Sequence, residues 1–279
     1  MPRARINGFS VHYQQIGQGP DLVLVHGLFC NLAFWYLTVA PILAKRFRVT
    51  VYDLRGHGYT ECMPTGYRAI DLADDLIALL DHLGIARAHL VGHSFGGAVT
   101  LACAARHPHR GATLSLVDAW VPSLQQIGKS FWQAQRGRLA AAGLEGDDQL
   151  PRVAYGFIEE LIEHRERDGA AAPLTSLFGP SDIAGDSQRL KKWRRLVEQT
   201  SATGELPDGT GLGRKEIAAV AMPSFALFGR RSRFLPTLLA LETLMPSLTS
   251  RTIANAGHLF PLLQPMLLVE HIDGFLADH

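Results

Sequence analysis

The sequence predicts an α/β fold in which a mostly parallel sheet is flanked by helices on both faces. Short, continuous apolar runs alternate with helical patterns along the chain, and such runs are typical of strands that are covered on both sides. Glycine-containing loops follow two of these runs, at His26-Gly27 and at Asp53–Gly58. Strands that alternate with helices in this way form open parallel sheets.

The composition supports one large core and excludes several classes of partner. The chain has 279 residues, of which 47% are hydrophobic and 19% charged, as is ordinary for a globular enzyme. Its net charge of +1 gives no reason to expect nucleic acid or an anionic membrane as a partner. No apolar run is long enough to span a membrane, and the first residues carry no apolar signal segment. The cysteines Cys30, Cys62 and Cys103 lack metal-ligand spacing, so we expect reduced thiols in a cytoplasmic protein without metal or cofactor.

The first part of the chain is expected to contain a hairpin, two buried strands and two helices. Asn7-Gly8 tolerates positive φ and therefore predicts a tight turn between two short strands. In chain order, the expected elements are strands at Arg5–Ile6, Val11–Gln14, Leu22–Val25 and Val49–Tyr52, with helices at Phe34–Ala44 and Asp71–Leu83.

A strand, a sharp turn and a helix are expected around Ser94. The apolar lead-in 89–91 is followed by Gly-His-Ser94-Phe-Gly and then by an Ala-rich helical run, 98–106. Glycines at Gly92 and Gly96 suit such a turn, since side chains there would collide with the neighbouring strand and helix. The same letters also occur in ordinary Gly-Ser loops. Their position between a buried strand and a helix favours an exposed nucleophile.

The second part of the chain contains an insertion between core strands. A strand at Thr113–Val117 delivers Asp118, and residues 121–213 then show helical patterns, Pro151–Arg165 and Asp186–Thr200, without a convincing strand. The sheet resumes with strands at Ser224–Phe228 and Arg251–Ala254, and a helix at Met266–Leu276 follows. We therefore expect a core formed by residues 1–120 and 214–279, with residues 121–213 as a helical cap over the carboxyl edge of the sheet.

A serine hydroxyl needs a base to remove its proton, and that base needs an orienting acid. His258 follows the last strand on the sheet edge that presents Ser94, so it is the candidate base. His26, His57 and His93 lie in tight loops and are interpreted as structural hydrogen-bonding residues. Acyl transfer also needs donors for the oxyanion, and the backbone N–H groups of Leu28 and Phe95 are the candidates.

The chain resembles the α/β-hydrolase fold superfamily, in particular its cap-bearing esterase-like, lactonase-like and dehalogenase-like branch. The resemblance is carried by His26-Gly27, Asp53-x-Arg-Gly-His-Gly58, Gly-His-Ser94-Phe-Gly-Gly97 and Gly257-His258, in the family's order. It implies a mostly parallel sheet with a cap inserted after the sixth strand. It also implies that the Asp53–Gly58 loop is structural and that Asp53 is not a catalytic acid.

The sequence departs from the family pattern at the expected acid. Most relatives place it after the penultimate core strand as Gly-x-x-Asp, whereas this chain reads Gly229-Arg-Arg-Ser232. A subset of the superfamily places the acid one strand earlier, which corresponds to Asp118. Other relatives carry an Asp there for structure. No other carboxylate precedes Glu242, which belongs to the following helix, so we predict Asp118 as the third member of a Ser-His-Asp triad.

A serine nucleophile excludes dehalogenase and epoxide hydrolase chemistry, which in this fold uses Asp at the turn. It leaves esters, lactones, thioesters, amides and some carbon–carbon cleavages, and two alternatives stay open: a carbon–carbon hydrolase acting on a diketone, and a member that binds a small molecule without turnover. Aromatic residues suggest a hydrophobic substrate, although each also suits core packing: Phe29, Trp120, Phe131, Trp132, Tyr155 and Phe157.

The basic run Lys191–Arg195 has its charges mostly opposite an apolar helix face and reads as a solvated surface. The alternative is docking of an acidic carrier protein, which would present an acyl thioester to the site. A small-molecule substrate is the partner expected in either case, and the sequence does not define the oligomeric state.

Overall fold

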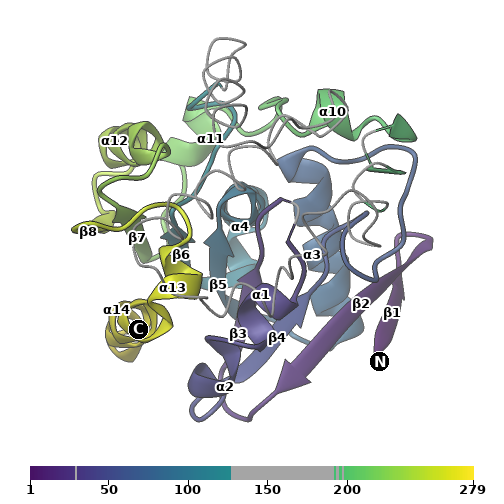
Figure 1. Cartoon of the computed structure of the whole chain (residues 1–279), viewed down its shortest axis with the longest axis horizontal. Helices are drawn as coiled ribbons and strands as arrows, with labels where there is room; N and C mark the ends of the chain where they lie inside the picture. The colour runs from purple at the N-terminus through teal and green to yellow at the C-terminus, as the bar shows by residue number, and fades with distance from the viewer. Residues whose placement is uncertain (29, 127–191, 193–194, 197) are drawn as a thin grey trace, which may run out of the picture.

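The structure is a computed structural model that describes residues 1–28, 30–126, 192, 195–196 and 198–279 (Figure 1). Its described residues form an 8-stranded sheet in the order β1-β2-β4-β3-β5-β6-β7-β8. The strands are β1 (Arg3–Ile6), β2 (Phe9–Ile16), β3 (Asp21–Val25), β4 (Arg48–Tyr52), β5 (Ala88–His93), β6 (Gly111–Val117), β7 (Ser224–Gly229) and β8 (Thr249–Ile253). The predicted α/β fold with a mostly parallel sheet is confirmed.

The sheet is antiparallel at one edge and parallel elsewhere. β1 pairs antiparallel with β2, and β2 pairs antiparallel with β4. β3 to β8 run parallel to one another. Asn7 and Gly8 connect β1 to β2 with φ angles of 48° and 84°, as the predicted hairpin requires. Because the parallel strands share one direction, the segments that follow them meet at the same edge of the sheet.

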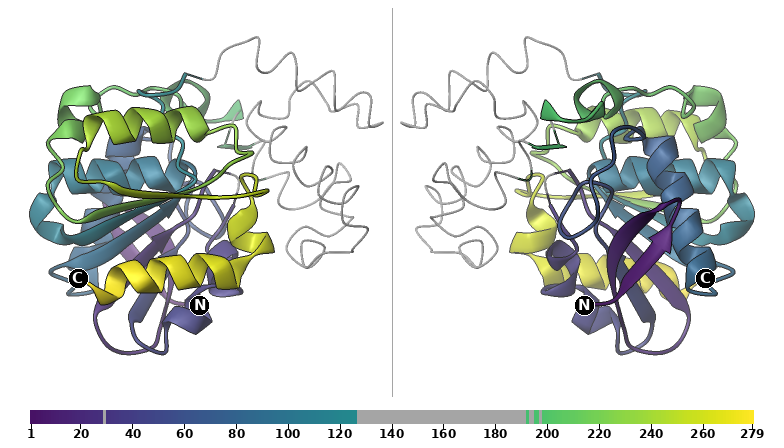
Figure 2. Two further views of the ribbon diagram at one scale, coloured as in Figure 1. Left: turned by 90° about the vertical axis from the view of Figure 1, so that its left-hand side faces the viewer. Right: turned by 90° about the vertical axis from the view of Figure 1, so that its right-hand side faces the viewer.

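Helices cover both faces of the sheet (Figure 2). The cluster on one face contains residues of α3 (Ala69–His82), α4 (Phe95–Arg106), α11 (Arg214–Ala218) and α12 (Leu235–Leu244). The cluster on the other face contains residues of α1 (Ala33–Tyr36), α2 (Ala40–Leu43), α13 (Phe260–Leu263) and α14 (Pro265–Ala277). The short helices η1 (Pro108–Arg110) and α10 (Ala202–Glu205) complete the described elements.

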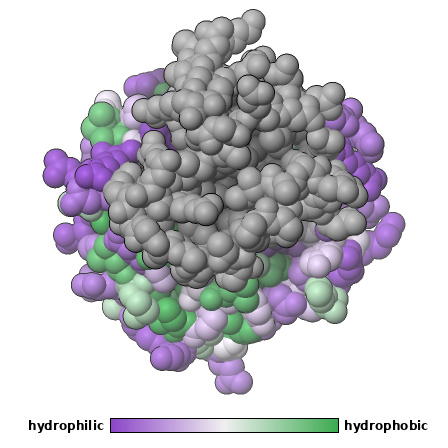
Figure 3. Space-filling model, viewed as in Figure 1, coloured by the Kyte–Doolittle hydropathy of each residue, from purple (hydrophilic) through white to green (hydrophobic). Residues whose placement is uncertain are grey.

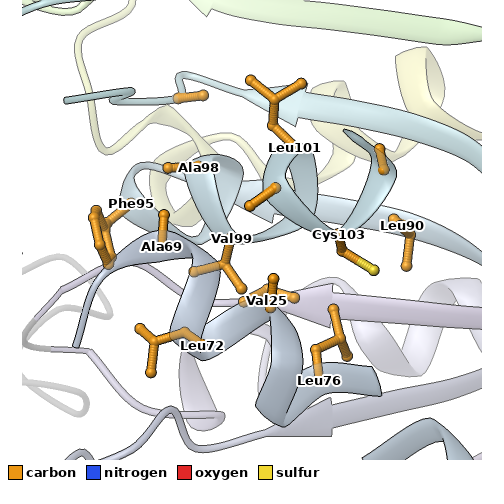
Figure 4. Packing of buried hydrophobic residues seen from close by; sticks show 14 of the residues in the cluster. Val25, Ala69, Leu72, Leu76, Leu90, Phe95, Ala98, Val99, Leu101 and Cys103 are labelled. Atoms are coloured by element: carbon orange, nitrogen blue, oxygen red, sulfur yellow. The ribbon is translucent and has the colours of Figure 1, made fainter. Parts of the chain in front are cut away.

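The core beneath the nucleophile turn is close-packed. Figure 4 shows side chains of α3, such as Leu72 and Leu76, beside Val99 and Cys103 of α4 and Val25 of β3. All five are within 1% of full burial. Burying an aliphatic side chain of this size stabilises the fold by about 1.5–3 kcal/mol. The helix that begins after Ser94 therefore rests on a rigid support.

One predicted helix is two helices in the structure. The sequence predicts a single helix over Phe34–Ala44, whereas α1 ends at Tyr36 and α2 begins at Ala40. Pro41 is the reason, because it lacks the N–H that a continuous helix would donate to the Leu37 carbonyl, and its ring would clash with that group. Pro41 lies in the first turn of α2, where neither problem arises.

Most of the predicted cap lies outside the described residues. The predicted helix Pro151–Arg165 is entirely outside them, and only parts of Asp186–Thr200 are inside. The end of the 121–213 segment contacts the core, since the Glu205 carboxylate accepts hydrogen bonds from the N–H groups of Gly66 (2.8 Å) and Tyr67 (2.7 Å). The domain boundaries at 120 and 213 remain predictions.

A buried ion pair connects the hairpin, the loop after β4 and α3. Arg55 donates two hydrogen bonds to Asp75, at 2.9 and 2.7 Å, and Asn7 donates a third at 2.8 Å. The Asp75 side chain is 4% exposed and that of Arg55 13%. Removing one partner of such a pair leaves the other charge buried and uncompensated.

We expect Asp75→Ala to lower the free energy of unfolding by about 3–5 kcal/mol, measured by urea denaturation. Asp74→Ala is the matched control, because the Asp74 side chain is 47% exposed and its contact with Arg106 is 3.5 Å long. That control is expected to change stability by less than about 1 kcal/mol. Equal effects of the two substitutions would contradict the structural role of the buried pair.

The described surface mixes polar and apolar residues (Figure 3). The exposed large apolar side chains among the described residues are Met1, Leu37, Tyr59, Leu239 and Met266. None of the described helices has the length and apolar character needed to cross a membrane.

Candidate active site

Ser94 lies at the apex of the turn between β5 and α4. Its φ of 56° is in the left-handed region, which is strained for a residue with a side chain. Backbone hydrogen bonds hold it there: Ser94 N–H donates to the Val117 carbonyl (3.1 Å), and the Ser94 carbonyl accepts from Trp120 N–H (3.0 Å). A Cβ at Gly96 would lie 2.4 Å from the Val25 carbonyl oxygen, so the close approach of α4 to β3 requires glycine. The local sequence therefore folds into the predicted strand–turn–helix.

Three side chains from distant parts of the chain form one hydrogen-bonded series. His258 Nε2 lies 3.0 Å from Ser94 Oγ, and His258 Nδ1 lies 2.6 Å from Asp118 Oδ2. All three residues are more than nine-tenths buried. An ionised carboxylate accepts only, so Nδ1 carries the proton and Nε2 is left to accept one from the hydroxyl. The arrangement can activate a serine for attack on a carbonyl carbon.

Asp118 is the first residue after β6 and has a φ of 44°. Its N–H donates to the Leu227 carbonyl of β7 (2.8 Å). Gly229 N–H donates to Asp118 Oδ1 at 2.9 Å, and the Ser232 hydroxyl donates to Asp118 Oδ2. Ser232 occupies the position where the sequence comparison with the superfamily expects an acid, and here it binds a carboxylate from the neighbouring strand.

Burial dominates the electrostatics of the site. It raises the pKa of Asp118 to about 6, although the hydrogen bonds from Ser232 and Gly229 oppose the increase. Burial and, to a smaller extent, the Arg233 guanidinium lower the pKa of His258 well below its ordinary value. The imidazole is therefore neutral at pH 7, which is the protonation state that a general base requires.

His93, next to the nucleophile, supports the imidazole of His258. Its ring stacks between those of Phe34 and His258, with centroids 4.6 Å from each. His93 Nε2 is 3.0 Å from the His258 carbonyl oxygen and donates to it. Burial lowers the pKa of His93 to about 3, so this ring stays neutral. On another side, Phe234 meets the His258 ring edge to face at 4.6 Å. The sequence predicts a structural role for His93, but it does not predict that its ring stacks on those of Phe34 and His258.

The two candidate oxyanion donors lie at this edge of the sheet. Phe95 is the first residue of α4, where backbone N–H groups have no partner inside the helix. Leu28 follows Gly27, and a Cβ built on Gly27 would lie 2.7 Å from Ser94 Cβ. His26 fixes this segment, because its Nδ1 donates to the Gly27 carbonyl (2.7 Å) while its Nε2 accepts from Leu54 N–H (3.0 Å). The N–H of Leu28 is therefore held close to the serine.

We expect Gly27→Ala to lower kcat/KM by about 100-fold, since displacing a nucleophile by roughly 1 Å costs that much. The added methyl group would also lie 3.3 Å from Ser94 Oγ. Gly274→Ala in α14 is the control, because a Cβ there has no atom within 4 Å. Ester hydrolysis by both variants, with thermal unfolding as a check of the fold, tests this. Unchanged kcat/KM in Gly27→Ala would contradict the close packing.

Asp53 has a structural role in the loop after β4. Its carboxylate lies 2.7 Å from His12 Nδ1 and accepts from the N–H groups of Leu32 (2.7 Å) and Tyr59 (2.8 Å). These contacts lower its pKa against the opposing effect of burial. Asp53 makes no contact with His258 in this arrangement, and it organises the loop after β4.

Of the aromatic residues suggested as substrate contacts, only Trp120 is among the described residues. It is 2% exposed, its Nε1 donates to the Gln125 carbonyl (3.0 Å), and its ring is 5.7 Å from Phe95 and 6.3 Å from Phe234. Trp120 is therefore a buried packing residue beside the site, in contact with Phe95 and Phe234. The remaining candidates lie outside the described residues: Phe29, Phe131, Trp132, Tyr155 and Phe157. The described residues contain no group of His, Cys, Asp or Glu side chains that could hold a metal ion.

The fold and this geometry define an α/β protein with a serine at a strained strand-to-helix turn. A family model described as alpha/beta hydrolase fold matches residues 20–265. A putative non-heme haloperoxidase of Mycobacterium phage D29 is 37% identical over 289 residues, which cover 98% of this chain and 93% of the relative. The chain belongs to the alpha/beta hydrolase fold family and is a hydrolase.

Further similarities include enzymes that act on esters and lactones. A pimeloyl-(acyl-carrier protein) methyl ester esterase of Aeromonas hydrophila is 28% identical over 278 residues, covering 96% of this chain and all (100%) of the relative. The solved enol-lactonase from Burkholderia xenovorans LB400 has a TM-score of 0.73 at 22% identity, covering 99% of this chain and 100% of that one. At that identity the structural likeness supports the fold alone.

Proposed function

We propose that this protein is a serine hydrolase that cleaves an ester, lactone or thioester of a hydrophobic small molecule. The observation that carries the proposal is the hydrogen-bonded series from Ser94 Oγ through His258 to Asp118, with distances of 3.0 and 2.6 Å. Such a series converts a weak hydroxyl nucleophile into an active one.

In the proposed mechanism, Ser94 Oγ attacks the substrate carbonyl carbon while His258 Nε2 takes the hydroxyl proton. Asp118 holds the imidazole and stabilises its cationic form. The N–H groups of Leu28 and Phe95 bind the oxyanion of the tetrahedral intermediate. Collapse of the intermediate breaks the bond to the leaving group, which receives the proton from His258. A water molecule, deprotonated by His258, then attacks the acyl-enzyme and releases the acid and the free serine.

The proposed class is tested with a panel of p-nitrophenyl esters, lactones, acyl thioesters and diketones. We expect hydrolysis of the first three classes, with kcat/KM rising as the acyl group becomes more apolar. Cleavage of diketones alone would instead indicate a carbon–carbon hydrolase. Failure of the whole panel, with no reaction of Ser94 toward a fluorophosphonate, would indicate a member that binds a small molecule without turnover.

We infer that a carrier protein presents the acyl group to the site. The support is the Aeromonas hydrophila relative, whose name places its methyl ester on an acyl-carrier protein. Comparing kcat/KM for one acyl ester, free and attached to a carrier protein, tests the inference. A gain with the carrier that is lost at high salt supports it, and equal values contradict it.

A further inference from the structure

The loop after β7 brings a hydroxyl to the carboxylate of Asp118. Ser232 lies three residues beyond the end of the strand, is 8% exposed, and donates its N–H to the Gly229 carbonyl at 3.0 Å. Its Oγ accepts from Phe234 N–H at 3.1 Å and donates to Asp118 Oδ2. Because Phe234 N–H takes up a lone pair of the hydroxyl, the proton of Ser232 is aimed at the carboxylate.

Three donors surround the Asp118 carboxylate. Gly229 N–H binds Oδ1 at 2.9 Å, while Ser232 O–H and His258 Nδ1–H share Oδ2. Donors to a carboxylate favour its ionised form over its protonated form. Two of these donors are a backbone group and the imidazole itself, so among the described contacts Ser232 is the only side chain outside the proposed triad that binds Asp118.

We propose that Ser232 is a positioning residue that keeps Asp118 ionised and keeps its Oδ2 directed at His258. The inference rests on the proposed function, in which Asp118 is the acid that orients the base. Ser232 does not touch the reacting atoms and acts through Asp118. It thus occupies the position of the acid expected from the superfamily and supports the acid of the neighbouring strand.

The charges around Asp118 make this contribution measurable. Besides His258, the titratable and charged groups near Asp118 are His93 of β5 and Arg233 of the loop after β7. The Arg233 guanidinium lowers the pKa of Asp118, whereas the His93 ring, with a pKa of about 3, is neutral in this pH range. Burial opposes the guanidinium and holds the pKa of Asp118 at about 6, within the range in which enzyme assays are made. Loss of the Ser232 donor would raise this pKa further. As pH falls, the Asp118–His258 pair would then take up its inactivating proton at a higher pH.

The test compares Ser232→Ala with Ser232→Thr, which keeps a hydroxyl. We expect the acidic limb of kcat/KM for one activated ester, recorded from pH 5 to 9, to move up by about one pH unit in Ser232→Ala. At pH 6 this variant should lose roughly fivefold more activity than at pH 8, whereas Ser232→Thr should retain the original limb. Ser115→Ala is the matched control, because Ser115 is fully buried on β6 and its hydroxyl has no hydrogen-bond partner among the described residues.

A second measurement does not depend on turnover. The proton between His258 Nδ1 and Asp118 Oδ2 can be followed by its downfield signal in proton NMR spectra. The titration midpoint of this signal should rise in Ser232→Ala but not in Ser115→Ala. A uniform loss of activity with an unchanged acidic limb and midpoint would mean that Ser232 only supports the loop through Phe234, and would overturn the proposal. Absence of turnover in the unsubstituted protein would contradict the proposed function, while the NMR midpoint would still decide the role of Ser232.

Discussion

Replacing Ser94 by alanine is expected to lower kcat for an activated ester by at least about 10⁴-fold. The hydroxyl oxygen is the atom that forms the acyl-enzyme, and no described neighbour offers another nucleophile at the same distance from His258. The substitution should leave the fold intact, because the backbone hydrogen bonds that hold the turn at a φ of 56° do not involve the Ser94 side chain. Burst kinetics with a p-nitrophenyl ester measure both the acylation step and the remaining turnover.

The control for this prediction is Ser115→Ala, which removes a buried hydroxyl from β6 without touching the site. It should keep full activity. If Ser94→Ala retained the hydrolysis rate of the unsubstituted protein, the reaction would proceed without a covalent intermediate on this residue, and the proposed mechanism would be wrong.

Asp118→Asn is expected to lower kcat by about 10³- to 10⁴-fold while KM changes little. The amide has nearly the same shape as the carboxylate, and asparagine tolerates the φ of 44° found here. However, an amide carries donors. The pair can relax by moving the imidazole proton to Nε2, and His258 then has no lone pair facing Ser94. Steady-state kinetics of Asp118→Asn, with its unfolding midpoint as a check of stability, measure the effect.

Glu242→Gln provides the matched carboxyl-to-amide control. Glu242 lies on α12, is exposed, and accepts a hydrogen bond from Ser250 Oγ at 2.6 Å. It should therefore have unchanged kcat. A large loss of kcat in Glu242→Gln, with little loss in Asp118→Asn, would mean that Asp118 is not the catalytic acid. It would also remove the basis for the proposed role of Ser232.

Local patterns were sufficient to predict most of the core. Continuous apolar runs define β3, β4 and β7 within one or two residues, and Asn7-Gly8 defines the hairpin. The break between α1 and α2 was missed, because the apolar spacing continues through Pro41 and suggests one helix. The antiparallel pairing of β2 with β4 depends on contacts between distant segments, which no local pattern encodes.

The site divides in the same way. Ser94 carries a strong local signal, since its glycines are spaced for a strand-to-helix turn. Asp118 was inferred from the absence of a carboxylate at Ser232. The hydrogen bond between these two residues could not be inferred, because it joins side chains 114 positions apart. The same holds for His93, whose stacking against His258 depends on how the loop after β8 folds back over β5.

The most direct test is the reaction of the protein with a fluorophosphonate, followed by intact-mass analysis and peptide mapping. We predict one adduct per chain, located on Ser94, with no adduct in Ser94→Ala and labelling slowed by at least about 10³-fold in His258→Ala. An unlabelled Ser94, or equal labelling rates with and without the His258 imidazole, would contradict the claim that these side chains form a working nucleophile.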